Sequence, residues 1–132
     1  MTHPQKILFI DDDDFKTEMR AQLLTDTRHH QVVVVDSFEE VKILYQKNKF
    51  DIVIIDFARD FGLESLRYID AIDPMQKMIT ISENEEYSEP KGCEYCVSHH
   101  QRRRLMSPFP FPELVHLIES FDLTMCAFRK HF

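Results

Sequence analysis

The chain contains 132 residues, of which 43% are hydrophobic and 30% are charged, and its formal net charge is −7. This size and balance are typical of one folded globular domain over residues 1–132 and exclude an intrinsically disordered chain. Such an acidic chain is also a poor candidate for general nucleic-acid binding, since phosphate contacts need a basic face. The sequence has no apolar run near the ~20 residues of a membrane span and no signal-peptide pattern at its start. We therefore expect a cytoplasmic protein without a membrane segment.

Four short runs of aliphatic residues predict buried β-strands. Continuous apolar runs of this length are typical of strands that are covered on both faces of a sheet. Their β-branched residues favour the extended conformation. The runs lie at residues 7–10, 32–35, 52–55 and 78–81. A fifth and weaker strand is expected at Leu105–Met106.

Segments with helical spacing separate these runs, because their apolar residues recur at intervals of three or four. The predicted apolar faces comprise Phe15, Met19 and Leu23 in the first helix, Val41, Leu44 and Tyr45 in the second, Leu63, Leu66 and Ile69 in the third, and Leu114, Leu117, Ile118 and Phe121 in the last. Ser37 and Glu40 have the capping-box spacing at the start of the second helix. Pro74 marks the end of the third helix, and Pro112 lies in the first turn of the last.

Residues 83–104 interrupt this alternation, because they are polar and contain Pro90 and Gly92. We expect a short or irregular fourth helix there, and Arg102–Arg104 in a solvated loop. The alternation of strands and helices, at about 25 residues per unit, predicts an α/β fold. Its architecture would be a doubly wound, five-stranded parallel sheet with helices on both faces.

The residues that follow the predicted strands are acidic or carry a hydroxyl group. Asp11 and Asp12 follow the first strand, Asp56 the third and Ser82 the fourth. Doubly wound sheets bind ligands outside the carboxyl ends of their strands, where these side chains would converge. One aspartate after a strand would indicate only a helix cap, but clustered carboxylates repel one another unless a hard divalent cation neutralises them. The sequence therefore predicts a Mg²⁺ site formed by the three aspartates.

Four sequence blocks carry this predicted pocket: Lys6–Asp12, Phe50–Asp56, Met78–Ser82, and Ser107–Phe109 followed by Glu113 and Leu114. In their order and spacing they resemble the response-regulator receiver family of two-component signalling, and the resemblance covers nearly the whole chain. It implies that Asp56 accepts phosphate from a histidine kinase as an aspartyl nucleophile. It also implies that Asp12 binds Mg²⁺ directly, that Asp11 acts largely through water, and that Ser82 is the switch hydroxyl.

The chain departs from this family in the cationic half of the pocket. Receivers carry a lysine before proline at the end of the fifth strand, and Ser107 fills that slot here. A competing alignment takes Gly92–Val97 as the fifth strand and puts Ser98 in the slot, but the spacing of the following residues favours Ser107. The family's aromatic switch position falls at Arg104.

The loop that follows Asp56 is also shorter than in the family, although the backbone carbonyl of Ala58 could still bind Mg²⁺. It runs from Phe57 to Gly62. Losing a cation that contacts phosphate removes a charge-assisted interaction of ~1.5–3 kcal/mol. We therefore predict that phosphorylation of Asp56 couples poorly to the switch.

Three cysteines suggest a metal site at the opposite end of the sheet. Cys93 and Cys96 have the spacing of a metal knuckle, and Cys126 is followed by His131. The predicted topology brings both segments to the amino end of the sheet, so the four residues could bind a structural Zn²⁺ ion. Alternative fourth ligands are His99 and His100. The other interpretation is three inert thiols, since cysteine also behaves as a small hydrophobe.

The histidines without such spacing are expected on the surface, and they are His3, His29, His30 and His116. Phe109 and Phe111 are expected to anchor the last helix in the core or to form part of a partner-binding face.

These patterns together predict a stand-alone receiver that acts by binding a partner, such as a histidine kinase or another signalling protein. We expect no DNA-binding domain after the last helix, and the oligomeric state stays open. One alternative is a pseudo-receiver, a phosphorylation-independent interaction module stabilised by the zinc site. Another is an acid-pocket phosphatase or phosphotransferase, which is disfavoured because no separate general base is visible. We therefore do not expect an enzyme.

Overall fold

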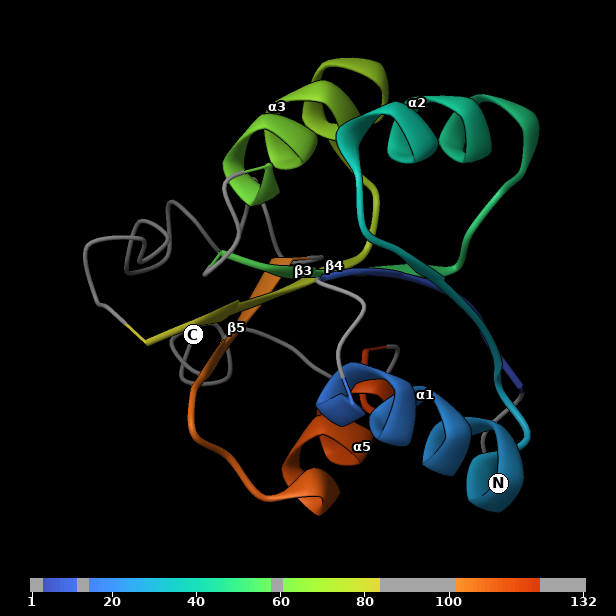
Figure 1. The fold of residues 1–132 in the computed structure, drawn as a ribbon, viewed down its shortest axis with the longest axis vertical. Coiled ribbons are helices and arrows are strands. Elements are labelled where there is room, and N and C mark those ends of the chain that lie inside the picture. The colour runs from blue at the N-terminus through green and yellow to red at the C-terminus, as the bar shows by residue number, and fades with distance from the viewer. Residues whose placement is uncertain (1–3, 12–14, 58–60, 84–101, 122–132) are drawn as a thin grey trace, which may run out of the picture.

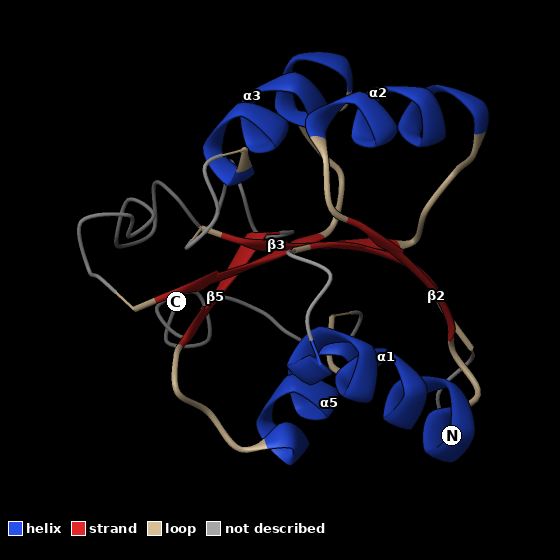
Figure 2. Cartoon of the chain, viewed as in Figure 1, coloured by secondary structure: helices blue, strands red, loops and turns tan. Residues whose placement is uncertain are grey.

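The computed structural model describes residues 4–11, 15–57, 61–83 and 102–121. Within these ranges, five parallel strands form one sheet in the order β2-β1-β3-β4-β5. The strands are β1 (Lys6–Ile10), β2 (Gln31–Val35), β3 (Ile52–Asp56), β4 (Met78–Ser82) and β5 (Arg102–Met106). The helices are α1 (Phe15–Arg28), α2 (Phe38–Lys47), α3 (Gly62–Ile72) and α5 (Phe111–Glu119). Helices α1 and α5 cover one face of the sheet, and α2 and α3 cover the other (Figures 1 and 2). The predicted α/β doubly wound fold is confirmed.

The sheet separates two apolar cores, as the continuous apolar runs predict. Successive side chains of a strand point to opposite faces, so Ile7 and Phe9 pack with α1 and α5 residues while Leu8 and Ile10 pack with α2 and α3 residues. All four side chains are fully buried. Strand β3 lies directly beside β1, with Ile10 opposite Ile55. The carboxyl ends of these two strands therefore lie side by side at one edge of the sheet.

The capping pattern at the start of α2 is confirmed. The hydroxyl oxygen of Ser37 accepts a hydrogen bond from the backbone N–H of Glu40 at 3.2 Å, which satisfies one of the unpaired donors of the first turn. Val41 and Tyr45 are buried, as the helical spacing predicts. In α5 the predicted Pro112 also lies in the first turn.

The predicted apolar face of α1 is wrong at Met19. Met19 is 44% exposed, whereas Thr17 and Leu24 are fully buried. Burial of Thr17 is tolerated because its hydroxyl group donates a hydrogen bond to Asp11. Thr17 is thus buried by a polar contact, although its polarity alone predicts that it faces solvent. Leu63, predicted on the apolar face of α3, is exposed as well.

The fifth strand is longer than predicted and contains the arginine triplet. Strand β5 pairs with β4 along its whole length, so the assignment of Arg102–Arg104 to a solvated loop is wrong. Arg102 is only 7% exposed. Its guanidinium group donates to the backbone carbonyls of Gln76 and Pro74, both at 2.9 Å. Arginine can therefore occupy a strand here because its charged end reaches backbone acceptors beyond the sheet.

His30 is buried, contrary to its predicted place on the surface. Helix α1 ends at Arg28. The next residue, His29, has a left-handed backbone with a φ of 63°, and its N–H donates to the carbonyl of Thr25 at 3.1 Å. This αL cap redirects the chain, and the next residue, His30, is 2% exposed. His29 and His116 are exposed, as predicted.

Among the helices of the described ranges, none is long and apolar enough to cross a membrane. The irregular fourth helix expected after β4 lies outside the described residues.

Candidate functional site

The strand order gathers three of the predicted site residues at the carboxyl edge of the sheet. Asp11 directly follows β1, Asp56 is the last residue of β3, and Ser82 is the last residue of β4. Strand β3 lies between β1 and β4, and Asp56 pairs with Ile81 in the register. The three side chains therefore come from neighbouring strand ends, as the sequence predicts. The fourth predicted residue, Asp12, lies outside the described residues.

Asp11 is held in place by two hydrogen bonds. Its backbone N–H donates to the carbonyl of Val35 at 3.1 Å, which continues the pairing of β1 with β2. Its carboxylate oxygen Oδ2 accepts from the hydroxyl group of Thr17 at 2.6 Å. Both residues are buried, with Asp11 2% exposed. The first turns of α1 therefore fix the orientation of this carboxylate. Sequence reasoning missed Thr17, because only the packing of α1 brings it to Asp11.

Gly62 packs against the backbone of Asp56. A Cβ atom added to Gly62 would lie 2.7 Å from the carbonyl oxygen of Asp56 and 3.3 Å from Cα of Phe57. Any larger residue must therefore push α3 away from this backbone. The N–H of Phe57 donates to the carbonyl of Ile81 at 2.9 Å, which extends the β3–β4 pairing past Asp56. Phe57 and Gly62, the first and last residues of the short loop, are therefore both held against neighbouring backbone. Ala58 lies outside the described residues.

Ser107 occupies the slot after the fifth strand. Its N–H donates to the carbonyl of Ser82 at 2.9 Å, and it precedes a cis peptide bond to Pro108. Because β5 ends at Met106, the alignment that takes Gly92–Val97 as the fifth strand is wrong. Serine therefore stands where a cation is expected from the family resemblance.

Phe109 continues this segment and anchors it to α1. Its ring lies beneath the guanidinium group of Arg20, with 4.5 Å between the carbon Cζ and the ring centroid. The Phe109 side chain also packs against the core on the α1 and α5 side, as does that of Phe111. Both aromatic residues therefore act as core anchors, which was one of the two predicted roles.

Arg104 supplies a half-buried cation near this edge, but not in the slot itself. It lies in β5 opposite Thr80. Its Nη1 atom is buried and has no hydrogen-bond partner within the part of the chain that the structure describes. Strand alternation puts it on the same face as Arg102, toward α3. The position that is aromatic in the family therefore carries a positive charge here.

The arrangement suits a small hard cation. Carboxylate oxygens are the ligands that Mg²⁺ prefers, and Asp11 and Asp56 bring one carboxylate each to adjacent strand ends. Across the described ranges, no three acidic, histidine or cysteine side chains form a complete metal cluster. The third predicted ligand, Asp12, is outside these ranges. The carboxylates of Asp11 and Asp56 therefore fit Mg²⁺ in kind.

The predicted Zn²⁺ ligands cannot be located in the same way. Cys93, Cys96, Cys126 and His131, together with the alternatives His99 and His100, lie outside the described residues. The zinc site stays a prediction from spacing alone. Elemental analysis of protein purified without chelators tests it, and less than about half an equivalent of zinc would contradict a structural site.

Solved structures similar to this chain are receiver domains. A CheY-like response-regulator receiver domain from Methylobacillus flagellatus has a TM-score of 0.69 and 21% identity, covering 90% of this chain and 99% of that one. The receiver domain of a sensor histidine kinase from Pseudomonas aeruginosa has a TM-score of 0.70 and 16% identity, covering 92% and 100%. That domain was solved with a magnesium ion coordinated in its active-site cleft.

A third similar structure is the response regulator TrrA from Thermotoga maritima, in complex with Mg²⁺ and beryllofluoride. It has a TM-score of 0.64 and 20% identity, covering 89% of this chain and 98% of that one. No protein-family model and no curated protein matches the sequence. At these identities the likeness concerns the fold. In each comparison it covers nearly the whole of this chain and of the matched chain. The chain therefore has the fold of response-regulator receiver domains.

Proposed function

We propose that this chain is a receiver domain that accepts a phosphoryl group on Asp56 from a histidine kinase and signals by binding a partner protein. The observation that carries this proposal is the position of Asp56 at the carboxyl end of β3, between Asp11 and Ser82 on the neighbouring strands. The receiver fold of the similar structures supports it, including the domain that coordinates magnesium. Over residues 1–132 the chain would act as one unit, with no chemistry of its own beyond this transfer.

The proposed transfer follows from the chemistry of the side chains. An oxygen of the Asp56 carboxylate attacks the phosphorus atom, and the bond from phosphorus to the donor breaks, with its electron pair leaving on the donor. Asp11, Asp12 and Asp56 would hold Mg²⁺, which offsets the negative charge of the entering phosphoryl group. Thr17 keeps the Asp11 carboxylate oriented. Ser82 is the hydroxyl group on the next strand, where it could donate to a phosphoryl oxygen.

Phosphorylation with acetyl phosphate and Mg²⁺, followed by intact-mass spectrometry, tests this proposal. The wild type should gain one phosphoryl group, and Asp56→Asn should gain none. Asp36→Asn is the matched control, because Asp36 is an exposed aspartate that follows β2 in the same way. It should be labelled like the wild type. No Asp56-dependent label with acetyl phosphate or with a phosphorylated histidine kinase would rule out the phosphoacceptor role.

Ser107 supports a second candidate function, a pseudo-receiver that binds partners without phosphorylation. Without a cation in that slot, the phosphoryl group loses a charge-assisted contact of about 1.5–3 kcal/mol. Titration with beryllofluoride and Mg²⁺, followed by NMR, separates the two functions. Shifts of the Asp56 and Ser82 amides favour the switching receiver, whereas an unchanged spectrum favours the pseudo-receiver.

Restoring the cation sharpens the distinction. For a switching receiver, Ser107→Lys should strengthen beryllofluoride binding by about 10- to 150-fold, which corresponds to that free energy. Met106→Lys is the control, because it adds the same charge one residue away at an exposed position. An equal gain in both variants would mean that general charge, and not the slot, governs binding.

A further inference from the structure

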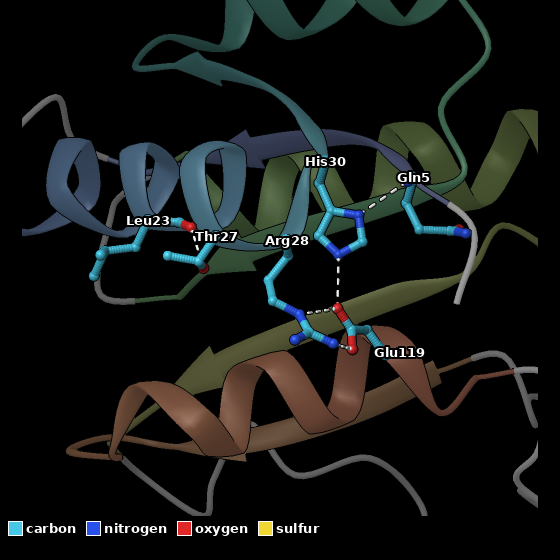
Figure 3. Close-up of polar contacts among 6 residues, drawn as sticks. All are labelled: Gln5, Leu23, Thr27, Arg28, His30 and Glu119. Carbon is cyan, nitrogen blue, oxygen red and sulfur yellow. Dashed lines mark hydrogen bonds and ion pairs between the residues drawn. The ribbon is translucent and has the colours of Figure 1, made fainter. Parts of the chain in front are cut away.

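A buried histidine connects the start of β1 to the last helix, on the opposite edge of the sheet from the candidate site. The ring of His30 lies between Gln5 and Glu119 (Figure 3). Its Nδ1 atom accepts a hydrogen bond from the backbone N–H of Gln5 at 2.9 Å. Its Nε2 atom lies 3.1 Å from Oε2 of Glu119. The side chain is only 1% exposed, so both contacts form away from solvent.

Only one neutral tautomer of His30 satisfies both contacts. A backbone N–H can only donate, so Nδ1 must present its lone pair to Gln5. The ring proton must then be on Nε2, where it is donated to the Glu119 carboxylate. A neutral imidazole with its proton on Nε2 thus satisfies both ring nitrogens.

Glu119 is kept ionised by a second partner. Arg28, at the end of α1, donates to it with two nitrogens (Figure 3), and the bond from Nε to Oε2 is 2.7 Å long. The hydrogen bond from Arg28 lowers the pKa of Glu119, and that from His30 adds to this effect, while partial burial opposes it. His30 therefore faces Glu119 from α5 and, through it, Arg28 from α1. From the start of β1, the described contact to the ring is the uncharged N–H of Gln5.

We propose that His30 is a proton-operated switch between the entry to β1 and the C-terminal helix α5. A proton taken from solvent can bind only at Nδ1, because Nε2 already carries one. That proton turns Nδ1 into a donor facing the N–H of Gln5, and two donors cannot form a hydrogen bond. The Gln5 contact breaks, while the contact with Glu119 becomes a full ion pair. Acidification therefore frees the entry to β1 and tightens the link between His30 and α5.

Loss of the Gln5 contact and strengthening of the Glu119 contact change the free energy of unfolding in opposite directions. Losing the Gln5 contact disfavours the protonated form, and the Glu119 carboxylate favours it. The expected signal is therefore local and not a change in overall stability. The backbone of Gln5 stays tied to β2, since its carbonyl accepts from the N–H of Gln31 at 2.9 Å. The start of β1 loosens without leaving the sheet.

NMR of the ¹⁵N-labelled protein, recorded at a series of decreasing pH values while the protein stays folded, tests the switch. At the upper end, the imidazole spectrum should show His30 with its proton on Nε2. As His30 takes up a proton, the Gln5 amide should shift with the same midpoint. Its protection from hydrogen exchange should fall about two- to tenfold, as expected for one net hydrogen bond.

Three results would overturn the proposal. They are a proton on Nδ1 at high pH, a Gln5 amide that does not follow His30, and a His30 that stays neutral until the protein unfolds in acid.

Two variants separate the switch from a general effect of pH. In His30→Asn, the side-chain oxygen can accept from Gln5 as Nδ1 does but cannot titrate, so the Gln5 amide should stay protected throughout. His29→Asn removes the exposed neighbouring histidine and should leave the wild-type titration intact. If His30→Asn does not fold, Glu119→Gln provides the test. Removing that charge should move the midpoints of His30 and Gln5 together to lower pH, and a Gln5 midpoint that stays in place would contradict the coupling.

Discussion

At the amino end of the sheet, polar side chains bind the backbone, whereas at the carboxyl end they gather at strand termini. Gln76, which is 7% exposed, illustrates the first use. Its Nε2 atom lies within hydrogen-bond distance of the carbonyls of Phe50, Asp51 and Lys77, at 3.1, 3.3 and 3.2 Å. Its Oε1 atom accepts from the hydroxyl group of Tyr45 at 2.8 Å. One amide thus joins α2 to the loops that lead into β3 and β4.

Arg102 extends this network to the edge strand. Besides its bonds to the Gln76 and Pro74 carbonyls, its guanidinium group lies 3.1 Å from the carboxylate of Asp70 at the end of α3. These contacts supply hydrogen-bond donors to backbone carbonyls at the beginnings of the strands, which would otherwise be buried without a partner. Gln76 and Arg102 therefore have a structural role at this end.

The carboxyl end uses its polar residues in another way. Asp11, Asp56 and Ser82 end neighbouring strands, and Thr17 and Gly62 support the first two from α1 and α3. Supporting residues fix the orientation of acidic side chains, which is the arrangement expected where a ligand binds. Substitutions at the amino end should therefore mainly change stability, while those at the carboxyl end should also change Mg²⁺ and beryllofluoride binding.

The largest effect is expected from breaking the amino-end network. Arg102→Met should lower the free energy of unfolding by about 2–4 kcal/mol, because it leaves several buried carbonyls without donors. Urea denaturation measures this change. Arg67→Met replaces an exposed arginine of α3 and should change stability by no more than about 0.5 kcal/mol. Equal effects of the two variants would show that the Arg102 contacts contribute little.

Gly62→Ala should lower stability by about 1–3 kcal/mol, because its methyl group would overlap the Asp56 carbonyl oxygen. Since the overlap falls on the backbone of Asp56, the variant should also weaken beryllofluoride binding. Leu63→Ala alters the next, exposed residue and should leave binding unchanged. Wild-type binding by Gly62→Ala would contradict the support that α3 gives to Asp56.

Thr17→Val should lower stability by about 1–2 kcal/mol, because the buried Asp11 carboxylate loses the donated hydrogen bond. The variant keeps the shape of the side chain, so a change in Mg²⁺ affinity would report on the orientation of Asp11. Isothermal titration with Mg²⁺ measures that affinity. Thr25→Val is the matched control, because Thr25 lies in the same helix, is exposed and donates only to the carbonyl of Ala21.

The smallest and most local effect concerns Tyr45. Its burial raises its pKa to about 12, and Asp73 adds to the rise while Arg102 opposes it. Because the folded pKa exceeds the ordinary value near 10, this contribution to stability is complete below pH 10 and is lost as the pH rises toward 12. In an ultraviolet titration, Tyr45 should contribute a component that ionises late. Tyr45→Phe should remove that late component, and its persistence would assign it to another tyrosine.

The central strands and the positions of Asp11, Asp56 and Ser82 could be predicted from the sequence. Continuous apolar runs are buried on both faces, and parallel strands bring their carboxyl ends to one edge. By contrast, β5 was predicted too short. Arg102 is buried through contacts with Asp70 at the end of α3 and with the loop that follows it, and Arg103 contacts Ser120 after α5. No local sequence pattern reveals these contacts.

The supporting residues could not be predicted either, because their partners are set by tertiary packing. The sequence predicts that Thr17 faces solvent, and only the packing of α1 on the sheet buries it. The close approach of Gly62 to Asp56 depends on the path of a loop. His30 contacts residues 25 and 89 positions away, so no spacing in the sequence could reveal its burial.

The three arginines of β5 also affect how readily this edge of the sheet pairs with other chains. Strand β5 is the last in the order, so one side of its backbone has no partner strand among the described residues. Exposed strand edges invite pairing with other chains, and charged side chains on the edge discourage it. The opposite edge strand, β2, carries four valines after Gln31 and no charge. Aggregation through strand addition should therefore begin at β2. The arginines of β5, which made this strand hard to predict from the sequence, also protect it from self-association.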